Sequence, residues 1–71
     1  MIISVFVYRT SEIYIIDNVD YNELKSKYED FEDVVEAYLE DEYGWHSSEI
    51  NWMTSDDVTM KIIDANDKNK H

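Results

Sequence analysis

The order of apolar patterns along the chain constrains its fold more than any other feature of the sequence. Between residues 20 and 44, apolar residues recur at alternating steps of four and three, the period of an α-helix with one apolar face. The segments on either side are rich in β-branched and aromatic residues, as is typical of strands. We therefore predict a small α+β fold of order ββαββ, in which one amphipathic helix packs on one face of an antiparallel sheet.

The four predicted strands form two pairs. Residues 2–8 and 13–16 are separated by a short polar segment, which predicts a β-hairpin with a longer loop. Residues 50–53 and 58–63 flank a second polar segment, and the latter run alternates between apolar and polar positions. We expect these two runs to be the last two strands of the sheet.

Local signals mark both ends of the predicted helix. Asp20 and Glu23 have the spacing of a capping box, in which each side chain satisfies a backbone N–H group at the helix start. Gly44 stands where a residue in the left-handed conformation would end the helix. We predict one helix from about residue 21 to 43. Ser26–Glu29 also has capping-box form, so a kink or a break there stays open.

Length and composition indicate a single cytoplasmic domain. The 71 residues suffice for one core, and we predict a domain of residues 1–64 followed by a polar tail of residues 65–71. The absence of cysteine favours a reducing cytoplasm, or the host cytoplasm if a phage encodes the chain. The apolar start lacks the basic flank of a signal peptide and is too short to span a bilayer. The oligomeric state stays open.

The charge balance restricts the possible partners. Seventeen Asp and Glu residues stand against six Lys and Arg residues, which gives a net charge of −11. Such a surface repels nucleic acid and anionic membranes and attracts basic proteins. We therefore expect a basic protein as the partner, and neither direct nucleic-acid binding nor membrane binding.

The residue types favour a protein that is not an enzyme. A chain with one glycine has no phosphate-binding loop, and thiol chemistry needs the cysteine that this chain lacks. His46 lies beside Ser47 and close to Glu42 and Glu49, but neighbours in sequence rarely point together, and one histidine with carboxylates specifies no metal ion. We predict no catalytic residues, no cofactor and no metal.

A long acidic segment is the strongest functional signal. Between Tyr28 and Met60 the sequence has eleven acids and no Lys or Arg. On one continuous helix, four of these acids form a stripe on the side opposite Leu24, Phe31 and Val35. The stripe consists of Glu29, Asp33, Glu36 and Glu40. An ordinary exposed helix face would gain from interspersed basic residues, which this one lacks.

The predicted partner-binding surface combines these acids with aromatic residues. Tyr and Trp are frequent anchors of protein interfaces, and three of them lie near the end of the predicted helix and in the strand that follows it. The predicted surface residues are Glu29, Asp30, Glu32, Asp33, Glu36, Glu40, Asp41, Tyr43, Trp45 and Trp52. Core packing is the alternative role for the aromatic rings, and a solvated helix face is the alternative for the acids.

A row of carboxylates on a rigid support is similar in charge density to the phosphates of one nucleic-acid strand. In size, charge and acidic helix the chain resembles the small acidic inhibitors of phages and mobile elements, of the anti-CRISPR or anti-restriction class. That resemblance implies a DNA or RNA mimic that inhibits a basic nucleic-acid-binding protein. An immunity protein or antitoxin against a basic toxin or nuclease is one alternative. An acidic soluble domain without a basic partner is the other.

Overall fold

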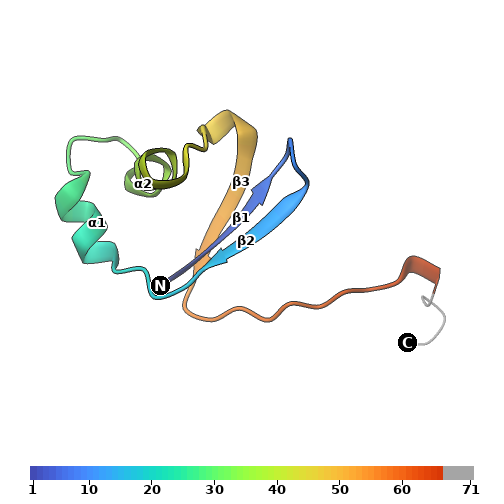
Figure 1. The fold of residues 1–71 in the computed structure, drawn as a ribbon. Helices are drawn as coiled ribbons and strands as arrows, with labels where there is room; N and C mark the ends of the chain where they lie inside the picture. The colour runs from blue at the N-terminus through green and yellow to red at the C-terminus, as the bar shows by residue number, and fades with distance from the viewer. Residues whose placement is uncertain (67–71) are drawn as a thin grey trace.

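A three-stranded antiparallel sheet with two helices on one of its faces forms the protein, as shown by the computed structural model, which describes residues 1–66 (Figure 1). In chain order the elements are β1 (Ile2–Val7), β2 (Glu12–Ile16), α1 (Tyr21–Lys27), α2 (Val34–Tyr43), the short 3-10 helix η1 (Ser47–Glu49) and β3 (Ile50–Ser55). The strand order β2-β1-β3 places β1 in the centre. The predicted α+β class is confirmed, whereas the order is ββααβ and not ββαββ.

The first predicted hairpin is present. Strands β1 and β2 pair antiparallel from Ile3 opposite Ile16 to Val7 opposite Glu12. The loop between them contains Ser11 with φ 57°, a left-handed conformation that this loop reaches without glycine or asparagine. The hairpin therefore follows from the strand pattern rather than from a recognisable turn sequence.

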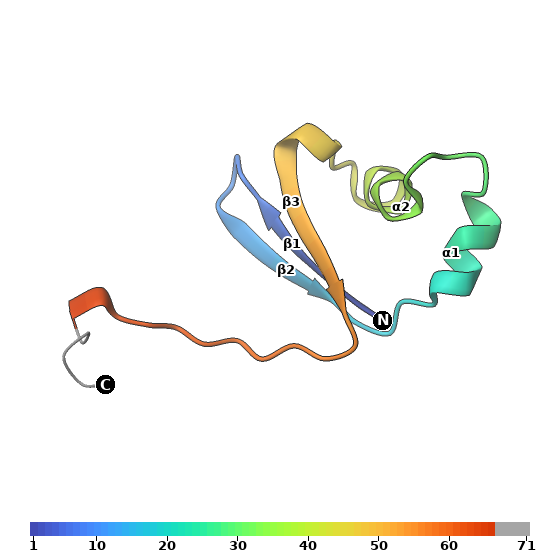
Figure 2. The same cartoon turned by 180° about the vertical axis from the view of Figure 1, so that it is seen from behind.

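The core lies between the sheet and the two helices. Alternate residues of β1 point to the helices, because side chains on a strand alternate between its two faces. The core consists of Ile3, Val5, Val7, Val19, Leu24, Tyr28, Val35, Leu39 and Ile50. Ile3 and Leu39 are completely buried. Figure 2 shows from behind that both helices lie on the same side of the sheet.

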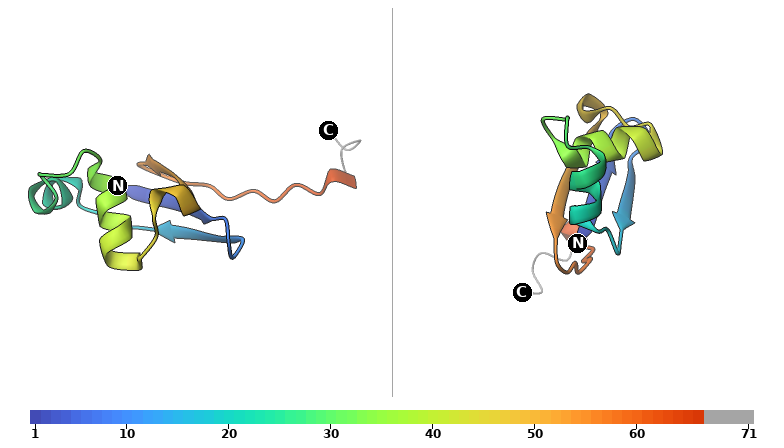
Figure 3. Two further views of the ribbon diagram at one scale, coloured as in Figure 1. Left: turned by 90° about the horizontal axis from the view of Figure 1, so that it is seen from above. Right: turned by 90° about the vertical axis from the view of Figure 1, so that its left-hand side faces the viewer.

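The prediction of one continuous helix is wrong, because the chain leaves the helical conformation between residues 28 and 33. A helix over residues 21–43 would be about 34 Å long, whereas a six-residue strand spans about 20 Å. Two shorter helices with different directions can both cover so small a sheet (Figure 3). The break also removes several like-charge neighbours that a continuous helix would place one turn apart.

Two of the four helix ends lie where the sequence predicts them, and the two ends at the break do not. The Asp20 side chain accepts hydrogen bonds from the backbone N–H groups of Asn22 and Glu23, so α1 starts as predicted. Asp33, and not Ser26, starts α2. Gly44 ends α2 in the left-handed conformation with φ 73°, as predicted.

The fourth predicted strand is absent from the described part of the chain. Strand β3 continues to Ser55, so only Asp56 and Asp57 are left to make a turn. Tight hairpins prefer residues such as Gly or Asn there, and two adjacent carboxylates supply neither.

The predicted boundary between residues 64 and 65 stays a prediction, and residues 67–71 of the predicted tail lie outside the described residues. Within residues 1–66, no helix is long and apolar enough to cross a membrane.

Candidate partner-binding surface

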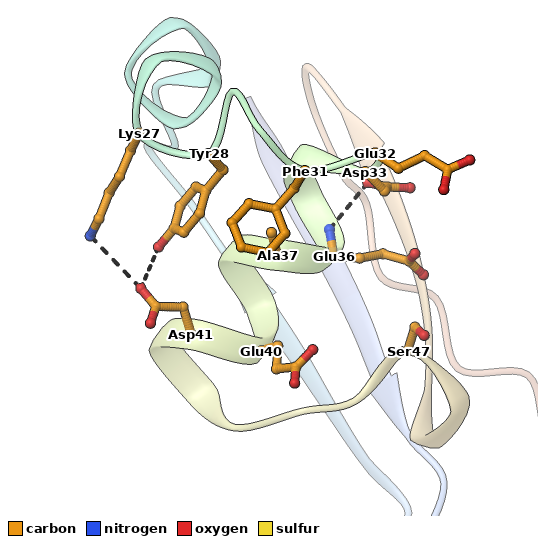
Figure 4. A pocket seen from close by; sticks show the side chains of 10 residues that line it. All are labelled: Lys27, Tyr28, Phe31, Glu32, Asp33, Glu36, Ala37, Glu40, Asp41 and Ser47. Atoms are coloured by element: carbon orange, nitrogen blue, oxygen red, sulfur yellow. Dashed lines mark hydrogen bonds and ion pairs between the residues drawn. The ribbon is translucent and has the colours of Figure 1, made fainter.

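A shallow hollow of about 1000 Å³ lies beside α2 (Figure 4). One wall is the turn between the helices, a second is the exposed side of α2, and Ser47 of η1 closes one end. Five of the predicted acids line it: Glu32, Asp33, Glu36, Glu40 and Asp41. The structure therefore brings half of the predicted surface residues together around one concavity.

The predicted acid stripe on a single helix is not correct. Glu29 lies in the turn before α2 and does not line the hollow, and Asp30 follows it in the same turn. Phe31 was predicted to lie on the buried side of the helix, yet its side chain is 59% exposed and lines the hollow with the acids. The break between the helices is the cause, because it rotates residues 29–31 away from the helical register.

Each of four carboxylates in the hollow has a hydrogen-bonding or ionic partner. Asp33 accepts hydrogen bonds from the backbone N–H groups of Val35 (3.1 Å) and Glu36 (3.2 Å). The Trp52 Nε1–H group donates to Glu36 Oε2 over 3.4 Å. Glu40 Oε1 lies 3.2 Å from His46 Nδ1. These contacts restrict the positions of the negative charges.

Asp41 is held by two residues from the end of α1. The Tyr28 hydroxyl donates to Asp41 Oδ2 over 2.6 Å, and Lys27 Nζ lies 3.9 Å from the same oxygen (Figure 4). The hydrogen bond to the carboxylate raises the pKa of Tyr28 above its ordinary value. A hydrogen bond with Tyr28 raises the pKa of Lys27 above its ordinary value. Sequence reasoning missed both residues, because no local spacing relates the end of α1 to position 41.

Six aromatic residues form a continuous row. Neighbouring ring centroids are 4.7 to 6.5 Å apart along the row, within the range of favourable aromatic contacts. The aromatic row consists of Tyr14, Trp45, Tyr43, Tyr38, Tyr28 and Phe31, in that order. The rings of Tyr43 and Trp45, two of the predicted surface residues, are stacked at 15°. Trp52 lies apart from the row, partly buried against the core.

The two ends of the aromatic row are accessible. Phe31 is 59% exposed at the hollow, and Tyr14 is 37% exposed beside β1. Tyr43, in the middle, is 43% exposed. The sequence does not indicate that Tyr14 belongs to the aromatic row. Tyr14 lies next to Trp45 only because β2 pairs with β1.

His46 and the carboxylates near it form separate pairs in the structure. Among residues 1–66, no three His, Asp or Glu side chains are placed to hold a metal ion together. His46 is paired with Glu40 and not with Glu42 or Glu49, the two carboxylates considered from sequence, while Glu49 lies 3.9 Å from Arg9.

No family model, curated protein or solved structure matches this chain.

Proposed function

We propose that the chain is a small acidic binding protein that inhibits a basic nucleic-acid-binding protein by occupying its binding groove as a DNA or RNA mimic. The observation that carries the proposal is the hollow lined by Glu32, Asp33, Glu36, Glu40 and Asp41. One ammonium group, that of Lys27, lines it with these five carboxylates.

The density of charge along α2 supports mimicry. From Asp33 to Asp41 the axis advances about 12 Å, and four of the lining carboxylates fall within that length. One strand of B-DNA carries a phosphate about every 3.4 Å of axis. A groove built for phosphates would therefore meet a similar number of negative charges here.

The restrained carboxylates and the exposed rings support tight binding in different ways. Long-range attraction between the net charge of −11 and a basic groove speeds association. Because Asp33, Glu36, Glu40 and Asp41 already have partners in the free protein, binding costs less side-chain entropy. Phe31 and Tyr43 offer exposed rings that can anchor the complex once it forms.

The first experiment identifies the partner and tests the mechanism on it. The protein is immobilised, bacterial proteins are captured at low salt, and those released at high salt are identified by mass spectrometry. Each captured protein is then mixed with fluorescent duplex DNA or single-stranded RNA, and displacement by the free chain is measured. We expect a basic cytoplasmic protein that loses its nucleic acid, with an inhibition that weakens steeply from about 50 to 200 mM salt.

A matched pair of charge-reversal variants tests the surface. The test variant carries Glu32→Lys, Glu36→Lys and Glu40→Lys, which leaves the Asp33 cap and the Tyr28–Asp41 hydrogen bond intact. We expect it to compete more than about tenfold less well, because attraction becomes repulsion at the contact.

The control variant reverses the same number of acids away from the hollow, at Asp17, Glu23 and Asp56. It changes the net charge equally and should retain most of the competition. If both variants lost competition equally, net charge alone would explain the inhibition. That result would contradict a defined binding surface. Inhibition of a toxin without competition for nucleic acid would instead support the immunity-protein or antitoxin alternative.

A further inference from the structure

The face of the sheet that points away from the helices is apolar and open. Antiparallel pairing places Ile13, Phe6 and Asn51 in one row across the sheet, and Ile15, Ser4 and Met53 in the next. The exposed fractions are 63% for Ile13, 40% for Phe6, 37% for Ile15 and 59% for Met53. We call Phe6, Ile13, Ile15 and Met53 the open face.

A second apolar surface lies on the segment that follows β3. The apolar residues of Val58–Ile63 include Met60, 66% exposed, Ile62, 95% exposed, and Ile63, 77% exposed. The alternation of this segment is that of a strand, and its composition is too apolar for an ordinary solvated tail. We call residues 58–63 the arm.

The arm leaves the molecule on the side of the open face. In Figure 1 the helices lie on one side of the sheet and the chain after β3 departs on the other, and Figure 3 shows the same arrangement from above. The radius of gyration is 15.0 Å, against about 11 Å for a compact domain of this length. The arm therefore extends beyond the domain instead of adding to its core.

Residues 58–71, which include the arm, are opposite in net charge to residues 1–57. Residues 1–57 carry fifteen acids and three basic residues, whereas residues 58–71 carry two acids and three basic residues. Lys61 alternates with Met60 and Ile62, so the arm can present apolar side chains to one surface and a cation to the other. The least acidic part of the chain is thus attracted to the domain of another copy.

We propose that a second copy of the chain covers the open face, with the arm of each copy lying along the open face of the other. A return of the arm onto its own sheet would need a tight turn at Asp56 and Asp57, which lack the residues that such turns prefer. Exchange between two copies needs no chain reversal at Asp56 and Asp57. Six extended residues span about 20 Å, which is the length of the strands that the arm would cover. The same contact occurs twice about a two-fold axis.

Single-cysteine variants test the exchange directly, since the chain has no cysteine of its own. Met53→Cys marks the open face, Ile62→Cys marks the arm, and Lys25→Cys marks the exposed side of α1. The full-length Met53→Cys and Ile62→Cys proteins are mixed and oxidised. We expect a mixed disulfide dimer from this pair and little or none when Lys25→Cys replaces Met53→Cys.

Sedimentation of the full chain gives an independent measurement. Wild type should have twice the chain mass of 8.5 kDa. Met60→Ser with Ile62→Ser on the arm should halve that mass, as should Ile13→Thr with Met53→Thr on the open face. Phe31→Ser, an equally exposed apolar residue on the helix side, should leave it unchanged. Circular dichroism checks that each variant is folded.

Three outcomes would overturn the proposal. The first is a wild-type protein with the mass of one chain. The second is a disulfide that forms only within one chain when Met53→Cys and Ile62→Cys are combined in the same protein. The third is a dimer that survives the arm variant. The arm and open-face variants leave every residue that lines the hollow unchanged, so they should remove the dimer without weakening competition for a basic partner. The two proposals can therefore fail separately.

Discussion

Gly44 shows how one residue sets the end of a helix. Its φ of 73° lies in the left-handed region, and a Cβ atom placed there would meet nothing within 4 Å. Any penalty for a side chain at this position therefore comes from the backbone and not from a clash.

We expect Gly44→Val to lower the free energy of unfolding by about 1–2 kcal/mol, because β-branched residues resist the left-handed conformation. Gly44→Asn should lose clearly less, since asparagine tolerates that conformation. Denaturant unfolding of the two variants measures the difference. Identical midpoints would mean that the conformation of residue 44 does not limit stability.

Three tyrosines give the protein a predictable response to alkali. Hydrogen bonds to carboxylates raise the pKa of Tyr28 and of Tyr14, and burial together with the Tyr43 hydroxyl raises the pKa of Tyr38 to about 12. The folded state thus holds these protons more tightly than the unfolded state, in which the ordinary pKa is about 10.

Their contribution to stability is present below about pH 10 and is lost as the pH rises toward about 12. We expect part of the phenolate absorbance to appear at higher pH in the folded protein than in denaturant. Tyr28→Phe should remove one late-titrating group. Superimposed titrations of the folded and unfolded protein would contradict the hydrogen bonds to Asp41 and Glu12.

At the scale of elements, local chemistry predicted the outer ends of the helical region, whereas it indicated an interruption only as an alternative, near Ser26–Glu29. The Asp20 cap and the Gly44 terminator act through neighbouring backbone groups, so their residue types suffice to identify them. The second helix starts at Asp33, whose spacing to Glu36 equals that of Asp20 to Glu23, so a local signal for this start was present in the sequence. The alternation of residues 58–63 likewise indicates a strand-like segment without showing which strand it pairs with.

The new helix start is testable at Asp33. We expect Asp33→Ala to lower the free energy of unfolding by about 1 kcal/mol, because the N–H groups of Val35 and Glu36 lose their acceptor. Glu32→Ala, one residue earlier and equally acidic, should change it by less than about 0.5 kcal/mol. Thermal unfolding distinguishes the two. A larger loss for Glu32→Ala would place the helix start elsewhere.

For the whole molecule, composition predicted the acidic surface and topology determined its shape. The long segment without Lys or Arg is visible in the sequence, and five of its eleven acids line the hollow beside α2. The position of Lys27 beside Asp41 and the contact of Tyr14 with Trp45 arise only after the helices and strands pack. Sequence reasoning therefore identified the main charges but not the residues that orient them.

Self-repulsion should govern the response of the protein to salt. The Arg9 and Lys27 ion pairs are 3.8 to 3.9 Å long and lie at the surface, where such pairs contribute little to stability. We expect the repulsion among the seventeen acids to outweigh them. We expect the free energy of unfolding to rise between about 0.05 and 0.5 M NaCl. A fall over this range would mean that the ion pairs matter more than the repulsion.

The central position of β1 also decides when folding can finish. Its Val7 pairs with Glu12 on one side, close in sequence, and with Ile50 on the other, across both helices. During synthesis the chain emerges from its N-terminus, so the β1–β2 hairpin is available long before β3. An isolated hairpin is marginally stable in water. The core must therefore wait until β3 has left the ribosome, and Trp52 on that strand should be the last ring to become protected from solvent.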